Sequence, residues 1–275
     1  MNSLDKFQEI ADSLDFEKKL ENSRITIDHE LKPPPPVIQV DNKSLNPVTI
    51  FTEGNISVIK GRAKTRKSFA VAIFTATAIS DIKLFRKFIS VPKKLVVYFD
   101  TEQSGFYVQQ AVYRIFQMSK GDGFEKRFYA FSLRKYPPHE RLEMIEFVFN
   151  NFKNLGFVVI DGIRDLIRDI NSPDEATMIS SKLLKWSEES GAHILNVLHE
   201  NPSDGKLRGH IGTELMNKAE TVLRVEIMES DKAISKISCD MVRGLNFDPI
   251  YFSINENIPE LVPDYDDEKS KFDLE

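Results

Sequence analysis

The sequence predicts an α/β protein with a mainly parallel, twisted sheet flanked by helices and an antiparallel extension at its C-terminal end. Strand-like and helical segments alternate from about residue 37 to 256. Two of the strand-like segments, 95–100 and 157–161, are continuous apolar runs that end in aspartate. Such runs are typical of strands buried on both faces of a parallel sheet, and the alternation with helices indicates βαβ units.

The order of elements follows from hydrophobic periodicity. Strands are predicted at 56–60, 95–100, 127–132, 157–161, 193–198, 221–227 and 234–239. Helices are predicted at 67–80, 104–119, 139–153 and 174–190. The strand at 95–100 is expected to neighbour the one at 56–60, and the last two strands are expected to form the antiparallel extension.

The two ends of the chain differ from this core. Residues 1–36 form an N-terminal helix and a proline-rich arm, because helical spacing over 3–22 is followed by the run Pro33–Pro36, which is a semi-rigid spacer. The arm is either a lid on its own core or a contact for a neighbouring subunit. Residues 257–275 are predicted to be an acidic, mobile C-terminal tail, since carboxylates cluster there among few apolar residues.

The composition excludes several classes of protein. With 41% hydrophobic residues, the chain can form a large core, and its net charge of −5 lacks the footprint of a constitutive nucleic-acid binder while allowing a local basic patch. The single cysteine, Cys239, excludes an intrachain disulfide and fits a reducing cytosol. No apolar run approaches the roughly 20 residues of a membrane span. We therefore expect a soluble cytoplasmic protein with no membrane contact.

The segment Gly61–Ser68 lies between a predicted strand and a predicted helix and matches the phosphate-loop pattern G-x-x-x-x-G-K-[ST], except that Arg66 replaces the second glycine. The backbone N–H groups and the helix N-terminus of such a loop bind anions, the lysine reaches the β- and γ-phosphates, and the serine ligates Mg²⁺. A nucleoside triphosphate is the expected ligand, and the alternative is a basic turn that caps a helix. The predicted binding residues are Gly61, Arg62, Ala63, Lys64, Thr65, Arg66, Lys67, Ser68 and Phe69.

Arg66 is the departure from the pattern. The second glycine of the loop usually takes a backbone conformation that costs other residues on the order of 1–2 kcal/mol, a cost that a bound triphosphate could offset. Arg62, Lys64 and Arg66 also add positive charge around the phosphates. The loop therefore has the character of a site for polyanions.

Polar residues follow three predicted strands at the same sheet edge. Asp161 can place a carboxylate near Mg²⁺, with a helix N-cap as the alternative role. Since Gly162 follows it, the adjacent glutamate of many ATPases is missing, and Glu102 is the candidate that orients and deprotonates a water molecule, unless it belongs to a turn. His199 could sense the γ-phosphate or be a hydrogen-bonded strand-end histidine.

Together with the segment 207–223, these motifs resemble RecA-type P-loop ATPases, most closely the replicative-helicase and plasmid RepA-like group of bacterial mobile elements. The resemblance covers about residues 37–256. It implies a RecA-like P-loop NTPase fold, ATP and Mg²⁺ as cofactors, and a homo-oligomer, commonly a hexameric ring, with ATP bound between subunits. It also implies that loops after the strands of Asp161 and His199 contact single-stranded DNA.

The resemblance also assigns roles to individual residues. Ser68 and Asp161 match the metal-binding positions. Arg243 matches the arginine of a Lys-x-Arg segment that family members insert into a neighbour's site, although Met241 replaces the lysine and a surface salt bridge is the alternative role. The catalytic residues that it implies are Lys67, Glu102, Asp161, His199 and Arg243.

Two loops carry cations that could contact DNA. Arg164 and Arg168 follow the strand of Asp161, and Lys206 and Arg208 follow the strand of His199. Neighbouring aspartates dilute this charge, so one copy would bind weakly and several copies in a ring would bind well. A solvated lid over the nucleotide is the alternative for these loops.

Two functional hypotheses follow. The first is an ATPase that acts on DNA as a motor or loader in plasmid or mobile-element replication, mobilisation or excision. The second is a nucleotide-dependent assembly or regulatory module with weak turnover and no DNA unwinding, which Arg66 and Met241 favour.

Overall fold

The computed structural model describes residues 15–41, 47–85, 88–90, 94–120, 123–201, 207, 209–263 and 265. The chain divides into two compact units, Met1–Pro33 and Pro34–Glu275. In the described part of the first unit, residues 15–23 are helical. Its large apolar side chains are exposed: Phe16, Leu20, Ile25, Ile27 and Leu31.

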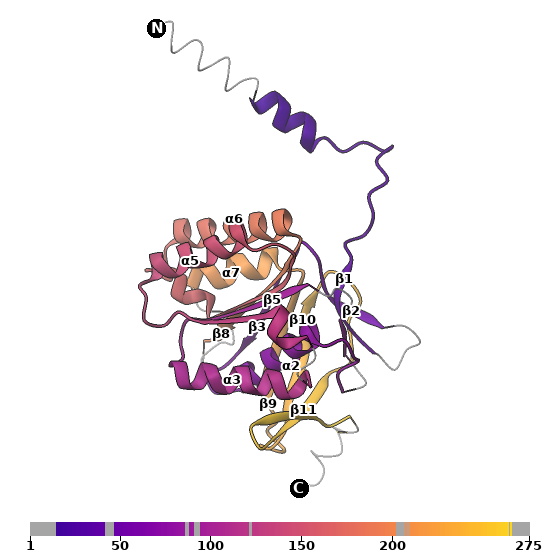
Figure 1. Cartoon of the computed structure of the whole chain (residues 1–275), viewed down its shortest axis with the longest axis vertical. Helices are drawn as coiled ribbons and strands as arrows, with labels where there is room; N and C mark the ends of the chain where they lie inside the picture. Colours follow the sequence, from indigo (N-terminus) through magenta and orange to yellow (C-terminus); the bar gives the residue numbers. More distant parts are fainter. Residues whose placement is uncertain are drawn as a thin grey trace, which may run out of the picture. The chain divides into compact units, whose positions relative to one another are not determined.

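A nine-stranded sheet in the order β12-β11-β10-β9-β3-β8-β7-β5-β6 forms the centre of the second unit, as far as the structure describes it (Figure 1). The strands from β9 to β6 pair in parallel, and β10, β11 and β12 continue the sheet antiparallel beyond β9. The parallel strands are β3 (Ile56–Gly61), β5 (Leu95–Asp100), β6 (Phe128–Ser132), β7 (Leu155–Asp161), β8 (His193–His199) and β9 (Thr221–Ile227). The others are β10 (Ser235–Val242), β11 (Ile250–Asn255) and β12 (Ile258–Leu261).

Helices cover both faces of this sheet (Figure 1). On one face α2 (Lys67–Ile79) packs against α3 (Gly105–Met118), and on the other lie α5 (Pro138–Asn151), α6 (Pro173–Ser190) and α7 (Gly209–Lys218). Because side chains alternate along a strand, each strand contributes to both layers. In β7, for example, Val159 packs with the α2 layer and Val158 with the α6 layer.

A second, three-stranded sheet in the order β2-β1-β4 lies beside α2. It contains β1 (Pro36–Val40), β2 (Val48–Thr52) and β4 (Phe88–Ser90). Phe74 of α2 packs edge-on against Phe51 of β2, at 5.2 Å between ring centroids, and against Phe88 of β4, at 5.8 Å. Phe51 also contacts Phe157 of β7, so these aromatic contacts join α2, which carries the start of the candidate site, to both sheets.

The predicted α/β class and the predicted strands and helices are confirmed, with ends that shift by one to three residues. One expectation was wrong: β5 does not neighbour β3, because β8 and β7 lie between them. The sequence also missed α7, the small sheet and the strands β11 and β12. Of these, β12 lies in the segment assigned to the acidic tail, so the sheet continues to Leu261. None of the described helices is long and apolar enough to cross a membrane.

Candidate nucleotide-binding site

The phosphate loop connects the buried end of β3 to the first turn of α2, as expected. Gly61 packs against the neighbouring strand β9 so closely that a Cβ atom would collide with the carbonyl oxygen of Val225 and lie 2.8 Å from Thr65 Oγ1. Only glycine fits there. The loop then turns through Lys64, at φ 65°, and Arg66, at φ 66° and ψ 27°, before α2 begins. Both residues have the left-handed conformation that glycine adopts more readily.

The side chain of Arg66 extends to the segment between β9 and β10 and to the first residue of β10. Its guanidinium donates hydrogen bonds to the carbonyl oxygens of Ala233 at 2.6 Å and Lys232 at 2.9 Å, and to Ser235 Oγ at 3.1 Å. These acceptors belong to the turn between β9 and β10 and the start of β10. The Arg66 guanidinium is thus hydrogen-bonded to this turn, and it keeps its positive charge because the three acceptors are uncharged.

Lys67 is buried at the start of α2, with 7% of its surface exposed. Its ammonium donates to the carbonyl oxygens of Gly61 at 3.0 Å and Arg62 at 2.8 Å, and it lies 3.1 Å from His199 Nδ1. The Lys67 ammonium thus bonds to uncharged carbonyl oxygens in this arrangement. A triphosphate oxygen that reached the loop would offer the ammonium a stronger, charge-assisted bond.

His199 connects Lys67 to the predicted base. Its Nε2 atom lies 3.3 Å from Glu102 Oε1, while its Nδ1 atom faces Lys67. The sheet register produces this contact, since Gly61 of β3 pairs with His199 of β8, and β7 and β5 end at the same edge. The hydrogen bond and the charge of His199, together with Lys67 and Arg164, lower the pKa of Glu102 below its usual value. Glu102 is therefore a carboxylate at neutral pH.

The turn that carries Glu102 depends on Asp100, the buried last residue of β5. The Asp100 carboxylate accepts hydrogen bonds from the backbone N–H groups of Glu102 at 3.0 Å and Gln103 at 2.7 Å, and from the Gln103 side chain at 2.7 Å. The hydroxyl of Thr101, the residue between Asp100 and Glu102, accepts a hydrogen bond from the backbone N–H of Gly162 at 2.9 Å. The turn is thus attached to the end of β7. The alternative reading of this segment as a turn applies to Asp100, which leaves Glu102 available for chemistry.

Asp161 and Asp100 share one hydroxyl group. Tyr98 Oη lies 3.0 Å from Asp100 Oδ2 and 3.2 Å from Asp161 Oδ2. A phenol has one proton to donate, so one of the two contacts is best satisfied when the carboxyl is protonated. Burial, followed by the charges of Asp100 and Glu102, raises the pKa of Asp161 to about 7. Asp161 is accordingly the carboxyl that holds a proton most readily.

This raised pKa predicts that Asp161 destabilises the nucleotide-free fold above neutral pH. Because its pKa when folded lies above that of an unfolded aspartate, the free energy of unfolding falls as the pH rises from about 4 to 7. We expect Asp161→Asn to raise the free energy of unfolding by about 2 kcal/mol at pH 8 and to leave it unchanged at pH 4. The expected gain is roughly half of what the full pKa shift would give, because the Asp161 side chain is partly accessible to solvent. Denaturation without divalent cations measures this, with the exposed Asp248→Asn as control. An equal gain at both pH values would contradict the prediction.

The donors near the loop fit Mg²⁺. The candidate ligands Ser68 and Asp161 offer hard oxygen atoms, which this ion prefers. Among the described residues there is no cluster of three or more side chains that could hold a metal ion by themselves. Such a sparse set suits Mg²⁺, which takes most of its ligands from phosphate oxygens and water. Phe69 contributes differently, because its ring packs 3.8 Å from the Arg114 guanidinium and its N–H bonds to Arg66.

A partly buried ionic cluster, which the sequence did not reveal, lies directly before the loop. Lys60 Nζ is 2.6 Å from Asp240 Oδ2 and 3.5 Å from Glu200 Oε1, which is in turn 3.0 Å from Arg224 Nη2. Lys60 precedes Gly61 and Glu200 follows His199, so the cluster fixes the ends of β3 and β8 against each other. The one signal in the sequence was a lysine at the end of the largely apolar strand of residues 56–60.

The structure does not bring the remaining predicted residues to the loop. Arg243 follows the end of β10, whose Val242 pairs with Thr221 at the start of β9, so Arg243 lies at the far end of the strands from its own phosphate loop. It is exposed and donates to the Lys218 carbonyl oxygen at 3.3 Å. Arg164 and Arg168 are exposed after β7. Lys206 and Arg208 lie outside the described residues.

Comparison with solved structures identifies the class of fold. Over 77% of this chain and 92% of the other, the structure is similar to that of the RadB recombinase, with a TM-score of 0.56 and 17% identity. It is also similar to a KaiC-like protein, PH0186 from Pyrococcus horikoshii OT3, over 78% of this chain and 91% of the other, with a TM-score of 0.53 and 18% identity. No protein-family model and no curated protein matches the chain. The chain therefore has the RecA-like P-loop ATPase fold.

Proposed function

We propose that this protein binds and hydrolyses ATP and couples hydrolysis to contact with DNA. The observation that carries the proposal is the continuous contact from Lys67 through His199 to Glu102 at the carboxyl edge of the sheet. It places a phosphate-binding cation and an ionised base on opposite sides of one imidazole. A γ-phosphate bound beside this imidazole would meet both groups.

The chemistry is in-line attack of water on the γ-phosphate. Mg²⁺, when bound by Ser68 and Asp161, supplies charge neutralisation at the phosphate oxygens. Lys67 exchanges its two carbonyl acceptors for phosphate oxygens and stabilises the charge that develops on them. Glu102 holds the water molecule and accepts its proton. His199, which touches both side chains, positions them relative to each other and responds to the occupied state of the site.

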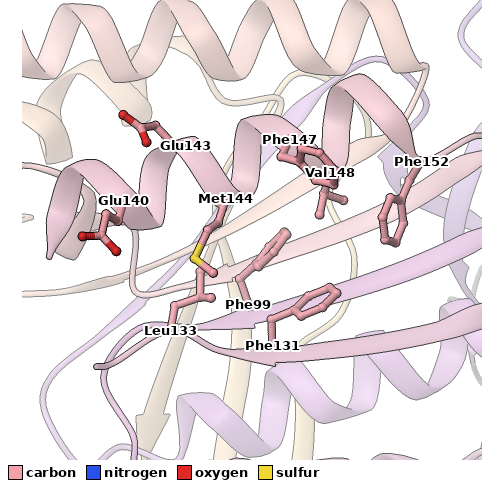
Figure 2. A pocket seen from close by; sticks show the side chains of 9 residues that line it. All are labelled: Phe99, Phe131, Leu133, Glu140, Glu143, Met144, Phe147, Val148 and Phe152. Atoms are coloured by element: carbon pink, nitrogen blue, oxygen red, sulfur yellow. The ribbon is translucent and has the colours of Figure 1, made fainter. Parts of the chain in front are cut away.

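The site is proposed to be completed by a second copy, because Arg243 is too far along its strand to reach its own loop. Exposed apolar surface supports assembly. A groove of about 440 Å³ lies between α5 and the edge of the sheet, where Met144 and Phe147 stand over Phe99 and Phe131 (Figure 2). Phe147 is 60% exposed. We propose that this groove and the exposed apolar side chains of residues 15–33 are buried between copies, in a ring such as the hexamer that the motif resemblance implies.

The DNA-related part of the proposal rests on placement and on motif order. Arg164 and Arg168 project from the segment after β7, beside the edge that holds the nucleotide. The charge of Arg164 is one of those that lower the pKa of Glu102, so this segment acts electrostatically on the proposed base. The order of the motifs resembles that of the replicative-helicase and RepA-like group, which supports a role in the replication, mobilisation or excision of a plasmid or other mobile element.

One experiment tests the function. ATP turnover is measured with and without single-stranded DNA, together with the mass of the protein in solution with a non-hydrolysable ATP analogue. We expect a larger assembly with nucleotide, and turnover that DNA increases by about tenfold or more, because several copies then present their cations together. Phe147→Asp should lose assembly and stimulation but still bind nucleotide.

The matched control is Leu184→Asp, which places the same charge on the exposed side of α6, away from the groove. It should assemble as the unchanged protein does. Assembly with nucleotide but without DNA-stimulated turnover would contradict the motor or loader and favour the nucleotide-dependent assembly or regulatory module. Absence of nucleotide binding would contradict both.

A further inference from the structure

Arg66 makes contacts that no glycine at its position could make. The loop accepts a left-handed arginine, and the side chain spans from the loop to the turn of residues 228–234 between β9 and β10. There its planar guanidinium holds two carbonyl oxygens and the Ser235 hydroxyl. The turn is also closed on itself by hydrogen bonds from Ala233 N and Ile234 N to Asp231. Arg66 therefore joins the phosphate loop to the turn of residues 228–234.

The turn lies on the side of the loop where the nucleoside of a bound nucleotide belongs. If the γ-phosphate faces Glu102 and Asp161, it lies over β8, β7 and β5, on one side of β3. The other end of the nucleotide must then extend across β9 and β10, on the opposite side of β3. An open cleft of about 1020 Å³ lies there, and both Arg62 and Thr65 of the loop and Met228, Ser230 and Lys232 of the turn line it.

We propose that Arg66 is a positioning residue that clamps the phosphate loop to the turn of residues 228–234 and so makes this turn one wall of the nucleotide site. The inference rests on the proposed ATP binding and adds a specific claim to it. A glycine at position 66 would leave the backbone of the loop conformationally free, whereas Arg66 holds the loop in one conformation against the turn that forms one side of the nucleotide site. Restoring the glycine of the motif should weaken nucleotide binding, although it relieves the left-handed conformation of residue 66.

The test measures the affinity and the dissociation rate of ADP and of a non-hydrolysable ATP analogue. Arg66→Gly is expected to weaken binding by about tenfold or more, mainly through faster dissociation, because hydrogen bonds to a charged donor are lost. Arg66→Lys keeps the charge and loses the planar fork, and it should lose most of this affinity as well. Retained affinity in Arg66→Lys would instead mean that Arg66 acts as a general positive charge.

The matched control is Lys120→Gly, because Lys120 is also an exposed basic residue with a left-handed backbone, at φ 55° after α3, and lies outside the site. It should bind nucleotide as the unchanged protein does. Ser235→Ala removes one acceptor without touching the loop and should weaken binding by a smaller factor, which keeps the proposal testable if Arg66→Gly does not fold.

Amide hydrogen exchange gives a readout that a purely structural role would not change. In the unchanged protein, nucleotide should slow exchange in residues 228–234, and in Arg66→Gly this protection should disappear. Equal affinity and equal protection in Arg66→Gly would overturn the inference while leaving ATP binding intact. If the unchanged protein itself bound no nucleotide, the proposed function would fail instead.

Discussion

Replacement of Lys67 by alanine is expected to lower ATP turnover by about a thousandfold or more. The Lys67 ammonium is buried and lies within 3.1 Å of two carbonyl oxygens and His199. Its removal takes away the charge that would stabilise the γ-phosphate in the transition state. It also leaves the carbonyl oxygens of Gly61 and Arg62 without this donor, so the anion cradle becomes repulsive to phosphate. Phosphate release under saturating ATP measures the effect.

The control for this variant is Lys185→Ala, since Lys185 is a solvent-exposed lysine of α6 that pairs only weakly with Glu189, at 3.8 Å. Turnover should be unchanged in it. Circular dichroism should show the same helical content in both proteins. If Lys67→Ala retained more than about a tenth of the turnover, Lys67 would not be the phosphate-binding lysine.

Replacement of Glu102 by glutamine is expected to lower turnover by a factor of about 10² to 10⁴ while ATP still binds. Glutamine keeps the size of the side chain and can still bond to His199, but it cannot accept a proton from water. Uncleaved ATP should therefore accumulate on the protein, in an amount that filter binding followed by chromatography can determine. Since the pKa of Glu102 is lowered, protonation of Glu102 should reduce turnover only at pH values below the usual range for glutamate.

Glu188→Gln, at an exposed position of α6, is the matched control and should leave turnover unchanged. Rapid hydrolysis in Glu102→Gln would remove Glu102 from the mechanism. The Asp161 carboxylate would then become the next candidate, despite its raised pKa.

Much of the site could be predicted because its residues follow buried strands. The apolar runs before Asp161 and His199 define parallel strands, and the ends of parallel strands meet at one sheet edge. The sequence therefore predicted which polar residues share that edge, and the structure brings Lys67, His199 and Glu102 together there. The order of the strands depends on pairing between distant segments, which local periodicity does not encode, and β5 was accordingly placed beside β3 in error.

Other features were missed for physical reasons. The strands β1 and β4 pair with each other from distant parts of the sequence and are only five and three residues long, so periodicity gave little signal. The interaction of Arg66 with the turn at Lys232 and Ala233 spans more than 160 positions of the sequence. A basic residue in a phosphate loop predicts proximity to phosphate, and only the three-dimensional structure shows that the Arg66 guanidinium is hydrogen-bonded to this turn.

The register that aligns the ends of β3, β8, β7 and β5 has a consequence for how such a protein can change. His199 and Asp161 are the last residues of β8 and β7, whereas Lys67 and Glu102 belong to the connections that follow β3 and β5. A connection that carries none of these groups, such as the one beyond Glu200, can thus change in length without moving them. Replacement of the connection beyond Glu200 should therefore leave the proposed intrinsic rate of ATP hydrolysis unchanged.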